Sequence, residues 1–196
     1  MSHSDIAVTQ LIAHYGLEPL PLEGGFFRAT WTAPGEGDGR PAGAAIIALL
    51  TADGEQFSAM HRLPVDELWH FYLGDPIELL LLDPDGTDRV VVLGPDVLAG
   101  QHVQLCIPQG TWMGGRVSEG GRWSLFGCTT APGFVASHYE GGDVEDLCAR
   151  YPQAAERIRR RCRVGVPLRH ENGSATVPPR SQHPQEGAAD PERAAQ

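Results

Sequence analysis

The stretch His61-Arg-Leu-Pro-Val-Asp-Glu-Leu-Trp-His-Phe-Tyr-Leu-Gly-Asp-Pro76 decides how this sequence is interpreted. A short connection separates two apolar-rich runs, so His61 ends one predicted strand and Glu67 begins the next. Side chains alternate between the faces of a strand. Two sets are therefore expected each to share one face, namely Phe57, Ala59 and His61 on the first strand and Glu67, Trp69, Phe71 and Leu73 on the second.

A histidine and a glutamate among apolar neighbours are typical of a pocket that holds a tuned acid/base pair. The other interpretation is a buried hydrogen bond between His61 and Glu67 that only joins two strands. The sequence by itself favours neither.

Short runs bounded by turn residues continue on both sides of this stretch. Pro-Gly, Asp-Gly and Gly-Pro pairs separate them, and such pairs bend a chain. Nine short strands at this spacing indicate an all-β sandwich, barrel or jelly roll rather than a parallel α/β sheet. The predicted strands are 25–32, 44–51, 56–62, 67–73, 77–83, 89–93, 102–107, 111–117 and 122–130.

Helices are expected only at the two ends of the domain. Apolar residues at helical spacing predict one over 4–15, with Ser4 as N-cap and Gly16 as terminator. Two more are predicted over 143–147 and 154–161. Residues 1–162 are therefore expected to form one domain, and residues 163–196, which have no apolar period, a disordered tail.

All 15 basic residues are arginine, and lysine is absent. This absence excludes a Schiff-base lysine, a P-loop lysine and a lysine general base. The net charge of −10 is unevenly distributed, because residues 1–149 hold 20 acidic residues and 6 arginines while residues 150–196 hold 9 arginines and 5 acidic residues. The acidic main body predicts no nucleic-acid partner.

No stretch approaches the length of about 18 apolar residues that a membrane span needs, and no signal-peptide pattern is present near Met1. A cytoplasmic location and no membrane partner are therefore expected. The four cysteines form no C-x-x-C pair, so they suggest neither a zinc cage nor a redox site, and Cys106 and Cys128 are expected to be buried.

The stretch 61–76 resembles the first motif of the cupin superfamily, H-x-H-x(3 or 4)-E-x6-G, with His61, Glu67 and Gly74 in register. The second histidine of that motif is Leu63 here. The second cupin motif is represented only by 108–110, since its histidine position is Met113 and its asparagine position Val117. Further motifs extend the resemblance over residues 7–162 and make it specific for one cupin group, namely Glu23-Gly-Gly-Phe-Phe-Arg28, Pro108-x-Gly-x-Trp112 and Ala131-Pro-Gly-Phe134.

That group is described as predicted sugar epimerases of unknown function. The resemblance implies a single cupin jelly-roll barrel (a double-stranded β-helix), commonly a homodimer, with a small-molecule pocket inside. It also implies similarity to metal-independent nucleotide-sugar epimerases that remove a proton next to a keto group. On that basis His61 is the candidate base and Glu67 its partner.

Four other residues are candidates for binding substrate. Arg28 could hold an anion bidentately at the barrel mouth, or pair with an acidic side chain. Trp112 could stack on a sugar or base, or fill the barrel. His70 and Tyr72 differ in parity from Glu67, so they should lie on the other side of their strand and are secondary candidates.

Two alternatives to the epimerase remain open. A binding or sensing protein would keep the same pocket without catalysis. A metal-dependent oxygenase would need a divalent ion, but two of the four usual cupin ligands are replaced by Leu63 and Met113, which are poor donors for Mn, Fe or Ni. No metal and no cofactor is therefore expected.

Overall fold

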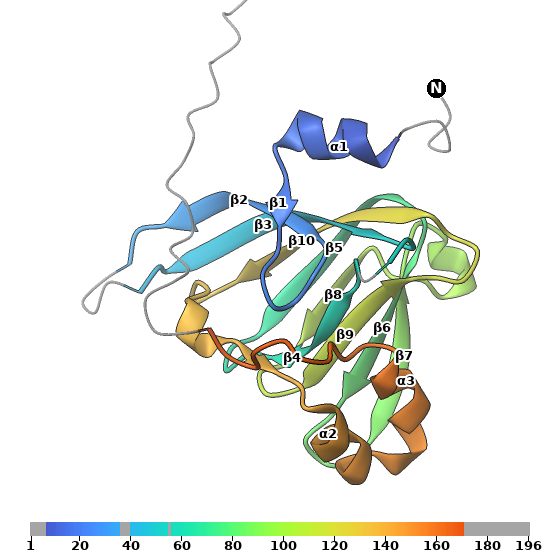
Figure 1. Ribbon diagram of the computed structural model, residues 1–196. Helices are drawn as coiled ribbons and strands as arrows, with labels where there is room; N and C mark the ends of the chain where they lie inside the picture. Colours follow the sequence, from blue (N-terminus) through green and yellow to red (C-terminus); the bar gives the residue numbers. More distant parts are fainter. Residues whose placement is uncertain (1–6, 36–39, 55, 171–196) are drawn as a thin grey trace, which may run out of the picture.

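Two antiparallel sheets face each other in the computed structural model, which describes residues 7–35, 40–54 and 56–170 (Figure 1). One sheet has six strands in the order β1-β2-β3-β10-β5-β8, and the other has five in the order β11-β4-β9-β6-β7. The strands are β1 (Glu18–Pro19), β2 (Phe26–Ala33), β3 (Gly43–Thr51), β4 (Ser58–Arg62), β5 (Glu67–Gly74), β6 (Ile77–Leu82), β7 (Asp88–Leu93), β8 (Gln104–Ile107), β9 (Trp112–Val117), β10 (Trp123–Thr130) and β11 (Glu140–Gly141).

Strand β6 shows how the sequence produces these layers. Ile77, Leu79 and Leu81 point between the sheets, where they join the main apolar core. Leu80 and Leu82 point the other way and are also fully buried, because helices cover that face. A strand buried on both faces is a continuous apolar run, which explains the Leu-Leu-Leu-Leu of this segment.

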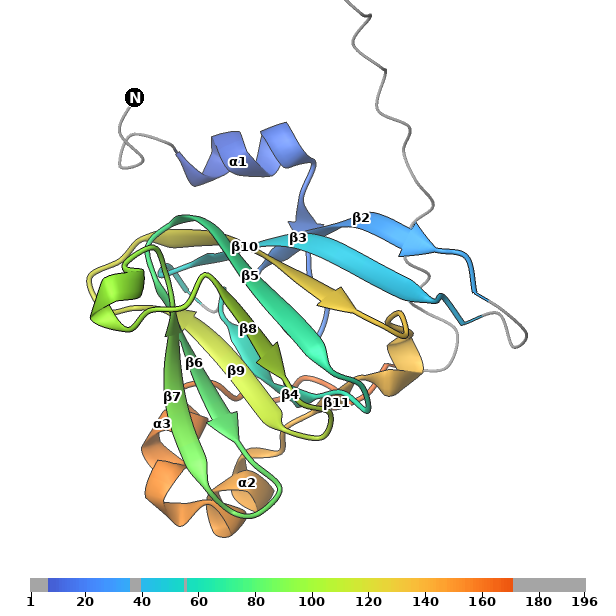
Figure 2. The same ribbon diagram turned by 180° about the vertical axis from the view of Figure 1, so that it is seen from behind.

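Helices cover the outer faces of both sheets (Figure 2). Helix α1 (Val8–Tyr15) packs through Leu11 on the six-stranded sheet, against Leu49 and Leu125. On the five-stranded sheet lie α2 (Val144–Arg150), the 3-10 helix η4 (Pro152–Ala154) and α3 (Ala155–Arg159). Two more 3-10 helices, η2 (Val97–Ala99) and η3 (Ala136–His138), lie in loops.

The ends of the helices follow the predicted signals, with shifted boundaries. Gly16 ends α1 in the left-handed conformation at φ 59°, as predicted for a glycine terminator. The predicted N-cap Ser4 lies outside the described residues, and Ala7 takes that position in the structure. Asp143 caps α2 by accepting hydrogen bonds from two backbone N–H groups of its first turn.

All nine predicted strands are present as β2 to β10, with ends that differ by a few residues, and the all-β jelly-roll prediction is confirmed. The two-residue strands β1 and β11 were not predicted, because two residues are too short for any alternation. No helix in the described part of the chain has the length and apolar character that crossing a membrane requires.

Two β-bulges change the side of the sheet on which some residues of β4 and β5 lie, compared with the prediction. The pairing of β10 with β5 passes from Leu73 directly to Phe71, so Tyr72 is the extra residue and Leu73 joins the core under α1 instead of facing inward with Trp69. A second irregularity lies between Ser58 and His61.

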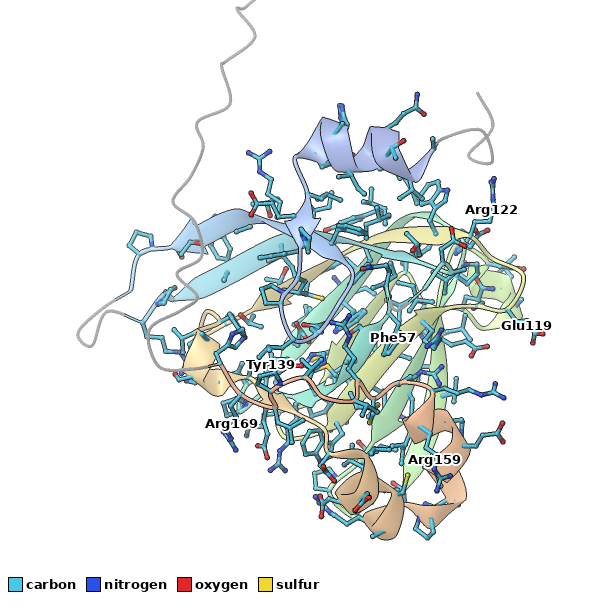
Figure 3. All side chains as sticks on the ribbon, in the orientation of Figure 1. Phe57, Glu119, Arg122, Tyr139, Arg159 and Arg169 are labelled. Carbon is cyan, nitrogen blue, oxygen red and sulfur yellow. The ribbon has the colours of Figure 1, made fainter. Side chains whose placement is uncertain are left out.

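The bulge in β4 corrects the prediction for Phe57. Ser58 donates a hydrogen bond to a carboxylate beside His61, so Ser58 shares the inward side with His61. Phe57 instead packs under the guanidinium of Arg116, 4.5 Å from the ring centre, and is labelled in Figure 3. A bulge of one residue reverses the alternation beyond it, and no sequence signal marks its position.

Candidate ligand site between the sheets

A cavity of about 290 Å³ lies at one end of the space between the sheets. The first predicted strand pair contributes His61, Leu63 and Glu67 to its wall. The remaining walls come from β1 to β3, from β10 and from irregular segments that precede and follow the barrel. These further lining residues are Glu18, Pro19, Leu20, Pro21, Glu23, Phe27, Ala29, Trp31, Ala44, Ala45, Ile46, Cys128, Thr130, Phe134, Tyr139 and His170.

His61 is held in one tautomer. Its Nδ1 lies 2.8 Å from the backbone oxygen of Ala59, and because a carbonyl oxygen only accepts, Nδ1 carries the proton. When the ring is neutral, its lone pair is therefore on Nε2. This atom lies 3.9 Å from both Oε1 of Glu23 and Oε2 of Glu67. His61 is 2% exposed, so this nitrogen is buried in the cavity wall.

Glu67 lies in a strongly desolvated position at the start of β5. Burial raises the pKa of its carboxyl group above the ordinary value, and the neighbouring Glu23 raises it further. Proximity to His61 and hydrogen bonds from Trp69 and Cys128 act in the opposite direction. The Trp69 indole donates to Oε2 at 3.0 Å. Glu67 is thus a carboxyl group able to hold a proton closer to neutral pH than an exposed glutamate can.

Glu23 is a third ionisable group at this site, and sequence analysis did not select it. The Ser58 hydroxyl donates to its Oε1 at 2.7 Å, and its backbone oxygen accepts from the Ala59 N–H at 2.9 Å. The preceding residue, Leu22, has φ 61°, a conformation that costs a bulky side chain on the order of 1 kcal/mol. The turn therefore holds Glu23 against His61 at the expense of local strain.

Glycine is required just beyond Glu23. Gly25 has φ 73°, and a Cβ there would lie 2.9 Å from the backbone oxygen of Leu49 in β3. The Glu-Gly-Gly motif thus lets the turn lie directly on the sheet while its carboxylate enters the cavity.

Tyr139 and His170 close the cavity from the C-terminal part of the chain. The Tyr139 ring stacks on His61, with ring centres 5.5 Å apart and planes inclined by 16°, and His170 packs edge-on against Tyr139 at 5.4 Å. Burial raises the pKa of the Tyr139 hydroxyl far above its ordinary value, so it stays protonated. Tyr139 and Arg169 are found on the side of the molecule away from the loop that carries Glu119 and Arg122 (Figure 3).

The chain after residue 162 contributes to this closure. The Gly141 N–H donates to the backbone oxygen of Leu168 at 2.7 Å, and Arg169 pairs with Glu140 at 3.4 Å. The start of the predicted tail, residues 163–170, is thereby attached beside the cavity, and the rest of it lies outside the described residues.

Two predicted substrate-binding residues lie away from the cavity. Arg28 points to the outer face of β2, because its neighbours Phe27 and Ala29 point inward, and it donates to the backbone oxygen of Tyr15 at 3.0 Å at the end of α1. Trp112 lies in the apolar cluster under α2 and α3, with the Arg62 guanidinium 4.6 Å above its ring. In both cases strand alternation turns the side chain outward.

His70 and Tyr72 also lie outside the cavity, on the opposite side of β5 from Glu67, as their parity predicts. Gln104 donates to Nδ1 of His70 at 3.0 Å, so Nε2 carries the proton and donates to the Thr129 hydroxyl at 3.1 Å. Burial lowers the pKa of His70, and Tyr72 is 48% exposed. Both ring nitrogens of His70 thus have hydrogen-bond partners within the protein.

The four cysteines are free in the structure, and their burial differs from the prediction in one case. Cys128 is buried beside Glu67, and burial raises the pKa of its thiol. Cys106 is exposed, because it lies on the outer face of the edge strand β8.

The donor set does not fit the metal ion that cupins commonly hold. Leu63 and Met113, at the two replaced positions, are hydrocarbon and thioether side chains in the apolar core. The carboxylate oxygens nearest to His61 already accept hydrogen bonds from Ser58 and Trp69. Among the described residues, no three His, Cys, Asp or Glu side chains form a group that could hold a metal ion.

Two facing sheets with a pocket at one end define a cupin-type barrel. Residues 9–141 match the model of the family described as Cupin superfamily (DUF985), and the chain belongs to that family. None of the curated proteins that were compared with it matches.

Solved structures agree with the family. A protein from Shewanella oneidensis is 30% identical, with 81% of this chain and 98% of that chain covered and a TM-score of 0.75. A hypothetical protein from Leishmania major is 29% identical, with 80% and 99% covered and a TM-score of 0.73. A cupin 2 domain-containing protein from Halorhodospira halophila, at 16% identity with 74% and 87% covered and a TM-score of 0.50, shares the fold.

Proposed function

We propose that the protein binds a small polar carbonyl compound in this cavity and moves a proton at the carbon next to the carbonyl, as isomerases and epimerases do. One observation carries the proposal. The only proton on the neutral imidazole of His61 is held at Nδ1 by the Ala59 carbonyl, so the lone pair of Nε2 is available in the wall of the cavity. A general base needs that arrangement.

The groups around His61 support each proton movement. Nε2 takes the proton from the carbon, the electron pair of that bond forms a carbon–carbon double bond, and the carbonyl oxygen receives a proton from Glu67. The raised pKa of Glu67 supports its role as that proton donor. Glu23, 3.9 Å from Nε2, stabilises the imidazolium that forms. Epimerisation follows if a solvent proton reaches the other face of the same carbon, while the enol returns its proton to Glu67 and Nε2 releases its proton to solvent. Isomerisation follows if Nε2 returns the proton to the former carbonyl carbon, while a hydroxyl group on the first carbon gives its proton to Glu67.

The composition of the cavity wall favours a ligand without phosphate groups. A nucleotide-sugar would need cations to hold its phosphates, and none of the described lining residues is an arginine. The chain has no lysine, and Arg28 lies on the outer face of β2. An unphosphorylated sugar or related hydroxy-ketone is therefore the ligand class that the proposal names.

The test is exchange of carbon-bound hydrogen with solvent. Hydroxyacetone, dihydroxyacetone and erythrulose would each be incubated with the protein in deuterated water, and loss of the proton signal next to the carbonyl would be followed by NMR. The wild type should accelerate exchange of at least one compound, and His61→Gln should reduce that rate by about 100-fold, a typical contribution of a general base.

The exposed His102 provides the matched control, so His102→Gln should exchange at the wild-type rate. Exchange by His61→Gln at the wild-type rate would contradict the role of His61. If the wild type accelerates exchange of none of these compounds, the catalytic proposal fails.

A further inference from the structure

Among the described residues, the cavity wall contains carboxyl groups but no guanidinium group. The carboxyl groups are those of Glu18, Glu23 and Glu67, and the wall also contains two histidines, His61 and His170. The Glu23 side chain is only 17% exposed, so water screens its charge poorly. Glu67, which holds a proton in the proposed reaction, adds no charge in that state. A negative ligand would be repelled here, and a positive one attracted.

Nearby arginines do not offset this charge inside the cavity. Arg62 and Arg169 both pair with Glu140, at 2.9 Å and 3.4 Å. Arg163 is close enough to Tyr139 to act on its hydroxyl electrostatically, but it is not part of the cavity wall. These three guanidinium groups are therefore not among the described residues of the wall.

The remaining wall suits an organic cation. Phe27, Trp31, Phe134 and Tyr139 place aromatic rings around the cavity, and aliphatic side chains fill the gaps between them. Aromatic faces attract an ammonium group through their quadrupole, and the effect is larger where water is excluded.

We propose that the cavity selects a small organic cation, so that the carbonyl compound named above carries a protonated or quaternary amine. This inference rests on the proposed function for the carbonyl group, but the charge preference can be tested without any turnover.

The test uses three probes of the same shape and different charge, namely choline, its neutral carbon isostere 3,3-dimethylbutan-1-ol, and the anion 3,3-dimethylbutanoate. Dissociation constants would be measured by calorimetry or by ligand-detected NMR at low salt. Choline should bind about tenfold or more tightly than the alcohol, because its ammonium group would contact aromatic rings and a glutamate carboxylate away from water. The anion 3,3-dimethylbutanoate should bind most weakly.

Variants locate the preference in the cavity. Glu23→Gln should bring the ratio of choline to alcohol affinity close to one. Because Glu23 lies in a strained turn and its replacement could disturb folding, Glu18→Gln at the exposed mouth provides a second variant, for which a smaller drop is expected. The exposed Glu119, in a distant loop, provides the control, and Glu119→Gln should leave the ratio unchanged (Figure 3).

The inference is overturned if the alcohol binds as tightly as choline, if the carboxylate binds most tightly, or if choline shows no saturable binding at about 10 mM. It is also overturned if Glu119→Gln changes the ratio as much as Glu23→Gln. Selective choline binding without hydrogen exchange refutes the catalytic proposal only. Exchange of neutral ketones without choline binding refutes the charge preference only.

Discussion

The space between the two sheets is filled at one end and hollow at the other, although the same strands line both parts. In β5, Trp69 and Phe71 belong to the apolar core, while Glu67, at the start of the strand, lines the cavity. In β4, His61 lines the cavity at one end of the strand. The core is built from the middles of strands, and the ionisable groups of the cavity lie at strand ends.

The difference shows how a barrel obtains a polar site without losing its stability. The ionisable side chains His61 and Glu67 lie at strand ends, where residues of irregular segments can contact them. Glu23 and Tyr139 are such residues, and both contact His61. The strand middles keep continuous apolar packing and supply the free energy of folding. Substitutions in the core should therefore lower the free energy of unfolding, and substitutions in the cavity should change ligand affinity.

The largest expected effect on folding is in the core. Ile77 is fully buried between the sheets, so Ile77→Ala should lower the free energy of unfolding by about 3 kcal/mol through lost burial and a new cavity. Urea denaturation measures this change. Choline affinity at 15 °C should stay within about twofold of wild type, because Ile77 pairs with Val117, whereas His61 pairs with Met113 at the other end of β9. A loss of affinity as large as that of Glu23→Gln would show that the two parts are not separable.

A smaller and pH-dependent effect is expected for Glu67→Gln. Because the native pKa of Glu67 is raised above 4.5, the native protein binds this proton more tightly than the unfolded chain. The stability that this proton contributes is present below pH 4.5 and is lost as the pH rises through the native pKa. The Gln variant does not titrate, so its stability relative to wild type should increase over that rise.

Thermal or urea unfolding at several pH values between 4.5 and 8 measures this difference. Glu119→Gln, at an exposed position, should show no such trend. A stability difference between Glu67→Gln and wild type that stays constant over this range would indicate that Glu67 remains ionised in the native protein.

The smallest effect is expected for Arg28→Ala. Its side chain binds the end of α1 on the outer face, so removing it should cost about 0.5 to 1 kcal/mol and leave choline affinity unchanged. Unfolding and binding measurements test both points. A fall in choline affinity of about tenfold would place Arg28 in contact with the cavity.

The alternation of strand residues predicted most of the fold but only part of the site. His61 and Glu67 lie together as predicted because a short connection joins the two strand ends that carry them. Arg28 and Trp112 were assigned to the pocket from their motifs, and alternation, applied to β2 and β9, turns both of them outward.

The residues that sequence analysis missed share one property. Glu23, Tyr139 and His170 lie in turns or beside two-residue strands, where no periodicity marks a direction for the side chain. A signal for Glu23 did exist, because Gly24 and Gly25 follow it and glycine pairs permit the backbone to approach a sheet closely. The bulges at Tyr72 and in β4 gave no signal of this kind.

The sequence by itself determined the nine strands, the jelly-roll class, the family resemblance and the pairing of His61 with Glu67, because these depend on local alternation and on short motifs. The tertiary structure decided which residues surround that pair, the charge of the cavity and the tautomer of His61. These depend on contacts between segments far apart in the chain, such as Glu23 with Ser58 and Tyr139 with His61, and the alternation of a single strand carries no information about them.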